Sequence, residues 1–235
     1  MKKYASVFAL YARSTMYRSL AVTLLGGAAQ VLLLLLRLKT KAPALPEDCI
    51  TGSGAGIALM ITFLLLTAVL CVPGAAPGTK YTLSRLRVSE GAAFWLHTLS
   101  NAVIYLFFWA AEIAVFAGFT QYFIAARSPA AGAQALFLAT YRTDLFHSLL
   151  PLRDWVLWLR NGLFIVSLSL ACAETPFLAR RKRYSFTGVP AAALVCVFFV
   201  RGLRDRMKLS TAVMLLIVLL VKVIADFMFL EEDDA

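Results

Sequence analysis

Apolar residues along the chain fall into runs separated by basic, polar or Pro- and Gly-rich breaks. The runs cover residues 20–36, 57–72, 92–126, 155–177, 189–200 and 209–230. Because about 20 apolar residues in a helix span the hydrocarbon core of a bilayer, each run predicts a membrane-spanning helix. The run at 92–126 exceeds that thickness and must tilt, bend or project. The run at 189–200 is short, so we expect that helix to be tilted or re-entrant.

The segments between these runs predict helices that lie along the membrane. In residues 1–18, one helical face carries Tyr4, Val7, Phe8 and Tyr11, which is typical of an interfacial helix. Residues 127–154 have apolar positions at near-helical spacing, broken by charged side chains, and predict an outer segment with a short interfacial helix. The first apolar run is too long for a cleaved signal, so we expect it to be retained.

These expectations define the fold class as all-α, a polytopic membrane protein of about six transmembrane helices in one domain, residues 1–235. Composition agrees, because 61 % of residues are hydrophobic, 15 % are charged and the mean hydropathy is +0.79. The net charge is +10. Basic residues beside apolar runs predict contact with anionic lipid headgroups, so we expect membrane lipids as partners and no nucleic acid.

Lys and Arg are equally numerous on the two predicted sides of the membrane, so their count does not orient the chain. The dense basic cluster at 180–183 and the two N-terminal lysines favour a cytoplasmic location for these segments. We therefore expect a multi-pass protein of the cell membrane with both termini in the cytoplasm. The cysteines form no C-x-x-C pair, and we expect them to be small buried hydrophobic residues.

Motifs of several enzyme classes are missing from the sequence. The two histidines lack a partner at metal-ligand spacing, which excludes an H-E-x-x-H zinc site. No G-x-S-x-G elbow is present. The Gly-rich run 52–56 lacks the Lys and Ser or Thr of a P-loop and predicts a loop and close helix packing. We expect no catalytic residue, cofactor or metal in this chain, and any ATP hydrolysis must occur on another chain.

The segment YTLSRLRVSE at residues 81–90 is the most informative of the basic breaks. A short helix there would present an apolar patch beside positive charges, although a solvated basic loop anchored to lipid is the alternative. Together with the following GAAFW, the segment resembles the coupling-helix region of ATP-binding cassette (ABC) permeases of the ABC-2 exporter class. The outer stretch YRTDLFHSLLPL is similar to small bacterial permeases that are encoded apart from their ATPase. The short run at 189–200 and the basic turn at 201–208 depart from that pattern.

The resemblance implies that one copy is half of a translocation unit. It would pair with an identical or sister permease and rest on two cytoplasmic ABC ATPase subunits, which hold ATP and Mg. Their closure would push on residues 81–90 and change the packing of the second and third spans. The implied ATPase contacts are Tyr81, Leu83, Arg85, Leu86, Arg87, Val88 and Glu90. The exported substrate would be amphiphilic or peptide-like.

Ionisable residues within the apolar runs are candidate functional groups, because burying a charge in a bilayer is costly. The clearest are Glu112, Lys222 and Asp226. By depth along their helices, Glu112 and Lys222 can meet, while Lys222 and Asp226 can pair within one helix. An ion pair that fixes packing, a role in a substrate path or gate, and snorkelling of Asp226 to the interface remain open. We expect Glu174 to pair with Arg180 or Arg181.

A histidine in the third apolar run and an acidic C-terminal tail are further polar features of the chain. His97 is expected to pack or to bind a carbonyl, and the acidic tail 231–234 either is solvated or docks on the basic cluster at 180–183 or on an ATPase. The alternative function is a non-transporting membrane scaffold or sensor that binds a cytoplasmic partner. A membrane enzyme acting on lipid is disfavoured by the missing motifs.

Overall fold

Helices make up all the regular structure in the described part of the computed structural model, which covers residues 2–41, 43–72, 89–127, 134, 137–138, 141–151, 154–179, 187–200 and 205–233. The helices are α1 (Lys2–Lys41), α2 (Pro46–Gly52), α3 (Ala55–Cys71), α5 (Glu90–Arg127), α7 (Asp144–Leu149), α8 (Trp155–Ala179), α9 (Gly188–Val200) and α10 (Asp205–Asp233).

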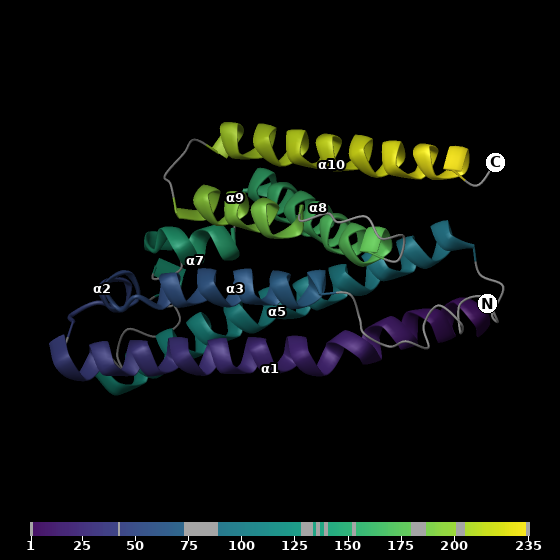
Figure 1. Ribbon diagram of the computed structural model, residues 1–235. Coiled ribbons are helices and arrows are strands. Elements are labelled where there is room, and N and C mark those ends of the chain that lie inside the picture. The colour runs from purple at the N-terminus through teal and green to yellow at the C-terminus, as the bar shows by residue number, and fades with distance from the viewer. Residues whose placement is uncertain are drawn as a thin grey trace.

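The long helices lie side by side and reverse direction at each connection, so that both chain ends lie at the same end of the molecule (Figure 1). We call this the terminal end. It also holds the first turn of α5, and α3 runs toward it but ends partway along the bundle, whereas α2 and α7 lie at the opposite end (Figure 1). Helix α1 packs on α3 and α5, α5 packs on α8, and α10 packs on the outside of α8.

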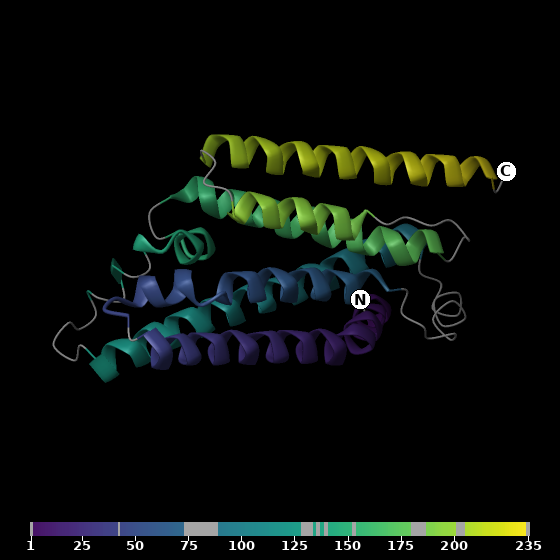
Figure 2. The same ribbon diagram turned by 60° about the vertical axis from the view of Figure 1, so that its left-hand side comes forward.

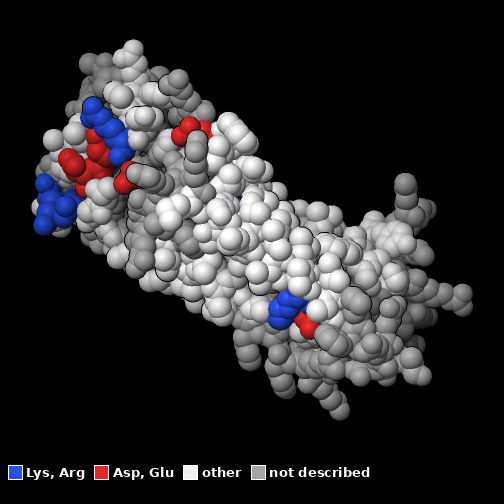
Figure 3. Space-filling view, turned by 90° about the horizontal axis from the view of Figure 1, so that it is seen from above, with Lys and Arg blue, Asp and Glu red and all other residues white. Residues whose placement is uncertain are grey.

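Four described helices are long and apolar enough to cross a membrane: α1, α5, α8 and α10. The pair α2 and α3 adds a fifth if it is counted as one span bent by 53°, while the apolar part of α9 is shorter. The described residues thus confirm the predicted all-helical fold and are compatible with a multi-pass membrane protein, while about six spans remains a prediction. Seen from the α10 side, the described charges gather mainly at one end, with a further patch beyond a broad uncharged surface (Figure 3).

Helix α1 is continuous over 40 residues, so residues 2–18 and the first predicted span form one helix, and the interfacial position of residues 1–18 remains a prediction. Its first turns are inclined to the rest of the helix (Figure 2). Val7 and Tyr11 are buried, and they form a small core cluster with Ala93 of α5. Part of the apolar face near the N-terminus therefore packs on α5, while Tyr4 on the same face is exposed.

The Gly-rich run at 52–56 contains the break between α2 and α3, as the sequence predicts. Gly54 has φ 78°, in the left-handed region that side chains with a Cβ disfavour. The break starts α3 at Ala55. The predicted outer segment 127–154 contains α7, a helix of 6 residues, among its described residues.

One of the two large core clusters lies between α3, α5, α8 and α9. Its buried side chains include Leu66, Tyr105, Phe164, Leu168 and Ala192. In a bilayer, close packing rather than exclusion from water favours such contacts, because lipid tails are themselves apolar. This core surrounds the cavity described next.

Candidate functional site

An apolar cavity of about 70 Å³ lies between α3, α5, α7, α8 and α9. Helix α5 contributes Tyr105, Phe108 and Trp109, and the other helices contribute mainly aliphatic and aromatic side chains. The remaining lining residues are Leu59, Met60, Phe63, Leu149, Asn161, Phe164, Ile165, Leu168, Val195 and Cys196. Such a lining suits a hydrocarbon or aromatic group, not a charged one.

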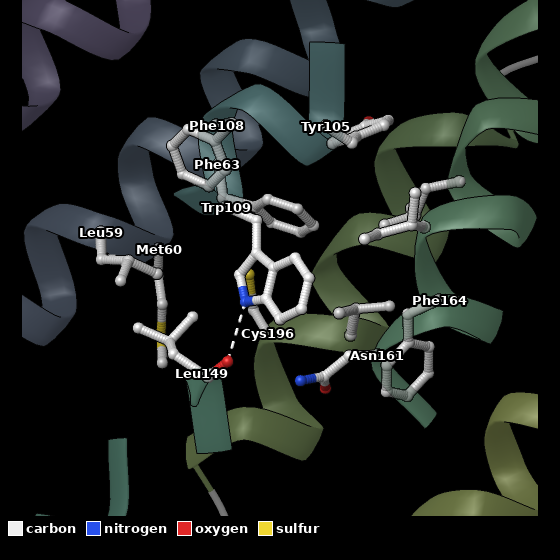
Figure 4. Close-up of a pocket in the computed structure, with 13 residues that line it drawn as sticks. Leu59, Met60, Phe63, Tyr105, Phe108, Trp109, Leu149, Asn161, Phe164 and Cys196 are labelled. Carbon is white, nitrogen blue, oxygen red and sulfur yellow. Dashed lines mark hydrogen bonds between the residues drawn. The ribbon is translucent and has the colours of Figure 1, made fainter. Parts of the chain in front are cut away.

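Trp109 forms the side of the cavity nearest α7 and is held there by a hydrogen bond. Its indole Nε1 donates a hydrogen bond to the carbonyl oxygen of Leu149 at 2.9 Å, and Figure 4 shows this bond across the cavity wall. The Trp109 ring also packs edge-on against Trp158, with ring centroids 5.2 Å apart. The single polar edge of the indole is thereby satisfied and the rest of the ring is apolar lining.

A buried polar cluster closes the same side of the cavity. Arg160, only 1 % exposed, donates from Nη2 to the carbonyl oxygen of Ser148 at 3.1 Å and to Oδ1 of Asn161 at 2.8 Å. Asn161 Nδ2 donates to the same Ser148 oxygen at 3.0 Å. These bonds join the start of α8 to α7. They also hold the Arg160 guanidinium against the side chain of the cavity-lining Asn161.

Glu112 lies on the far side of α5, where it faces α1. It is 1 % exposed, and its Oε1 accepts a hydrogen bond at 3.0 Å from Nε2 of Gln30, which is itself fully buried. Glu112 therefore contacts Gln30 and not Lys222, the residue at matching depth in α10. Depth along a helix does not specify the direction in which a side chain points, and Glu112 points to α1.

Lys222 of α10 contacts Glu174 of α8 instead. Its Nζ lies 2.5 Å from Glu174 Oε1, and the Glu174 side chain is 2 % exposed against 36 % for Lys222. The hydroxyl of Thr187, immediately before α9, donates to Glu174 Oε2 at 2.6 Å. Glu174 thus connects three segments. Its predicted partners, Arg180 and Arg181, lie outside the described residues.

The remaining predicted site residues fall in several places. Asp226 is partly buried one turn beyond Lys222 on α10. Residues 81–88 of the predicted ATPase contact lie outside the described residues, and Glu90 is the first residue of α5. His97 stacks on Tyr11, with ring centroids 4.5 Å apart.

Sequence reasoning missed Gln30, Arg160 and Thr187 as partners of buried groups. Gln30 is the one polar residue in the apolar stretch of residues 24–36, which was a usable signal. Arg160 follows two tryptophans and was counted with the interfacial basic residues, although it is buried. Nothing in the sequence singled out Thr187.

Comparisons of the chain with protein-family models, with curated proteins and with solved structures found no match. The class that the described helices support is therefore a multi-pass membrane protein.

Proposed function

We propose that this chain is the membrane-spanning subunit of an ATP-driven ABC transporter, which exports an amphiphilic or peptide-like substrate and is powered by a separate ATPase subunit. The proposal rests on the resemblance of residues 81–90 and on one feature of α5. That helix begins at Glu90, the last residue of the predicted coupling segment, and contributes Tyr105, Phe108 and Trp109 to the cavity.

The continuity of α5 supplies a physical route for force. From Glu90 to Tyr105 the helix rises about 22 Å, and to Glu112 about 33 Å, at 1.5 Å per residue. A helix resists compression, so a displacement of its first turn would move the cavity wall. Closure of an ATPase dimer on residues 81–90 would then favour one packing of α5 against α1 and α8 over another.

The lining of the cavity supports the proposed substrate class. Its exposed walls are apolar throughout, and the amide of the lining residue Asn161 is already bonded to Arg160 and Ser148. The hydrocarbon or aromatic part of an amphiphile would pack against Phe108 and Phe164. The cavity is smaller than such a molecule, so transport requires the helices to separate, and a second permease would complete the pathway.

The test is a purification from native membranes followed by ATPase assays in lipid vesicles. We expect an ABC ATPase to copurify, and we expect Arg85→Ala with Arg87→Ala to lower both its recovery and its stimulated activity by about tenfold. The matched control is Lys39→Ala with Lys41→Ala. It removes two exposed basic residues from the last turn of α1, away from the terminal end. This control should leave recovery and activity unchanged.

Two results would overturn the proposal. One is stable isolation of the chain without any nucleotide-hydrolysing partner, which would favour the membrane scaffold or sensor. The other is equal loss of recovery in both double variants, which would indicate a general charge effect on the membrane rather than a contact at residues 81–90.

A further inference from the structure

Two cysteines that are 101 positions apart in the sequence meet where α3 ends, on the side of the bundle that faces the terminal end. Cys71 is the last residue of α3, and Cys172 lies in α8. The Cys71 thiol donates a hydrogen bond to Cys172 Sγ, and the two sulfur atoms are 3.6 Å apart. Both are free thiols. Cys172 is fully buried, whereas Cys71 is partly exposed.

A chain of hydrogen bonds holds this thiol pair in place. The Tyr105 hydroxyl lies 3.3 Å from Cys172 Sγ and 2.8 Å from Thr67 Oγ1. These hydrogen bonds therefore connect α3, α5 and α8. Tyr105 also lines the cavity. Because both thiols sit on helices that pack together, their approach is a property of the fold.

The first residue of α9 leaves room for the pair. A Cβ at Gly188 would collide with Cys71 Sγ and would also contact Cys172 Sγ. Glycine allows α9 to begin directly against both sulfur atoms. The fold therefore keeps the two thiols adjacent and closes the space around them, except on the exposed side of Cys71.

We propose that Cys71 and Cys172 form a reversible disulfide that ties the end of α3 to α8. A disulfide needs its sulfur atoms about 2.05 Å apart, so the contact must close by about 1.5 Å. The oxidant is a small disulfide such as glutathione disulfide. The Cys71 thiolate attacks it and releases one thiolate, and the Cys172 thiolate then attacks Cys71 Sγ and releases the second. The two released thiolates take up the two protons that the cysteines lose.

The bond would have a regulatory character if the terminal end faces the cytoplasm, a placement that rests on the proposed function. Reducing conditions there make protein disulfides transient. The oxidised form would hold α3, α8 and the adjacent Tyr105 together, so the cavity wall could not rearrange. Formation of the bond itself does not depend on transport.

The experiment uses the full chain in detergent with Cys49→Ser and Cys196→Ser, which leaves only the proposed pair. After treatment with glutathione disulfide, we expect loss of both thiols to a maleimide reagent. The intact mass should fall by two hydrogen atoms without a glutathione adduct, and dithiothreitol should reverse the change. The bond should form at least about tenfold faster in the folded chain than in the same chain denatured in SDS.

Three outcomes would overturn the proposal: two persistent free thiols, glutathione adducts alone, or equal rates in the folded and denatured chains. Adding Cys172→Ala to the test chain should abolish the two-hydrogen loss. If that variant fails to fold, the comparison of folded and denatured chains still tests the proposal, because both samples contain Cys71 and Cys172.

Discussion

Individual polar residues determine how the apolar helices of this bundle pair. Glu174 illustrates this, because one of its carboxylate oxygens forms an ion pair with Lys222 of α10 and the other accepts a hydrogen bond from Thr187 before α9. A buried carboxylate without partners would be strongly unfavourable in an apolar environment. The requirement for partners therefore selects one arrangement of α8, α9 and α10 among many that would pack equally well.

This role predicts an asymmetry between single and double variants. Lys222→Met should lower the free energy of unfolding by about 3 kcal/mol, because it removes the cation from a buried carboxylate. Adding Glu174→Gln should restore most of that loss, since a neutral amide still accepts from Thr187. Unfolding in mixed micelles measures both variants, with Lys39→Met as an exposed control. Additive losses in the double variant would contradict the pairing.

At the scale of elements, α1 and α5 are the longest helices and meet through a buried polar contact. At 40 and 38 residues they extend to about 60 and 57 Å, roughly twice the bilayer core. Apolar side chains allow such helices to slide or rotate against each other. The Gln30–Glu112 hydrogen bond specifies one register between them. Glu112 therefore has a structural function before any role in transport is assigned.

The contact predicts different outcomes for two substitutions at Glu112. Glu112→Leu leaves the Gln30 amide unsatisfied and should cost about 2 kcal/mol in unfolding free energy. Glu112→Gln keeps an acceptor and should preserve the fold, but it removes a group that can be charged and should lower transport coupling. Unfolding and vesicle transport assays separate these effects. Unchanged transport in a stable Glu112→Gln protein would leave only the packing role.

At the scale of the whole molecule, the alternating directions of the helices place both termini at one end (Figure 1). The last helix, α10, packs on α8 and leaves much of its apolar surface exposed, including Met214, Val218 and Val221. An exposed apolar face on a helix long enough to cross a bilayer suits contact with lipid. The molecule therefore has uneven packing, with α1, α3 and α5 on one side and α10 at the periphery.

This arrangement predicts how the chain is oriented in a cell. In a background without native cysteines, Lys41→Cys should react with a membrane-impermeant maleimide in intact cells. Tyr4→Cys should react only after permeabilisation, because the terminal end is proposed to be cytoplasmic. Labelling of both variants after permeabilisation is the control. The reverse pattern would place residues 81–90 outside the cell and remove the proposed contact with a cytoplasmic ATPase.

The apolar runs alone determined the helical class and the approximate positions of its long helices, because run length and composition are local properties. They predicted the run at 92–126 as one helix, which α5 confirms at Glu90–Arg127. They also placed the break between α2 and α3 at the Gly-rich run, because a backbone with positive φ requires glycine at that position itself. The apolar face at residues 1–18 did not specify whether membrane or another helix covers it, because amphipathic spacing is the same in both cases.

The tertiary structure decided which buried groups meet. Sequence spacing gave the depths of Glu112 and Lys222, but their partners, Gln30 and Glu174, depend on helix rotation and on which helices are neighbours. The same holds for Cys71 and Cys172, which appeared to be isolated apolar residues in the sequence. Contacts between distant segments follow from the packing of all the helices together, and no local pattern in an apolar run encodes that packing.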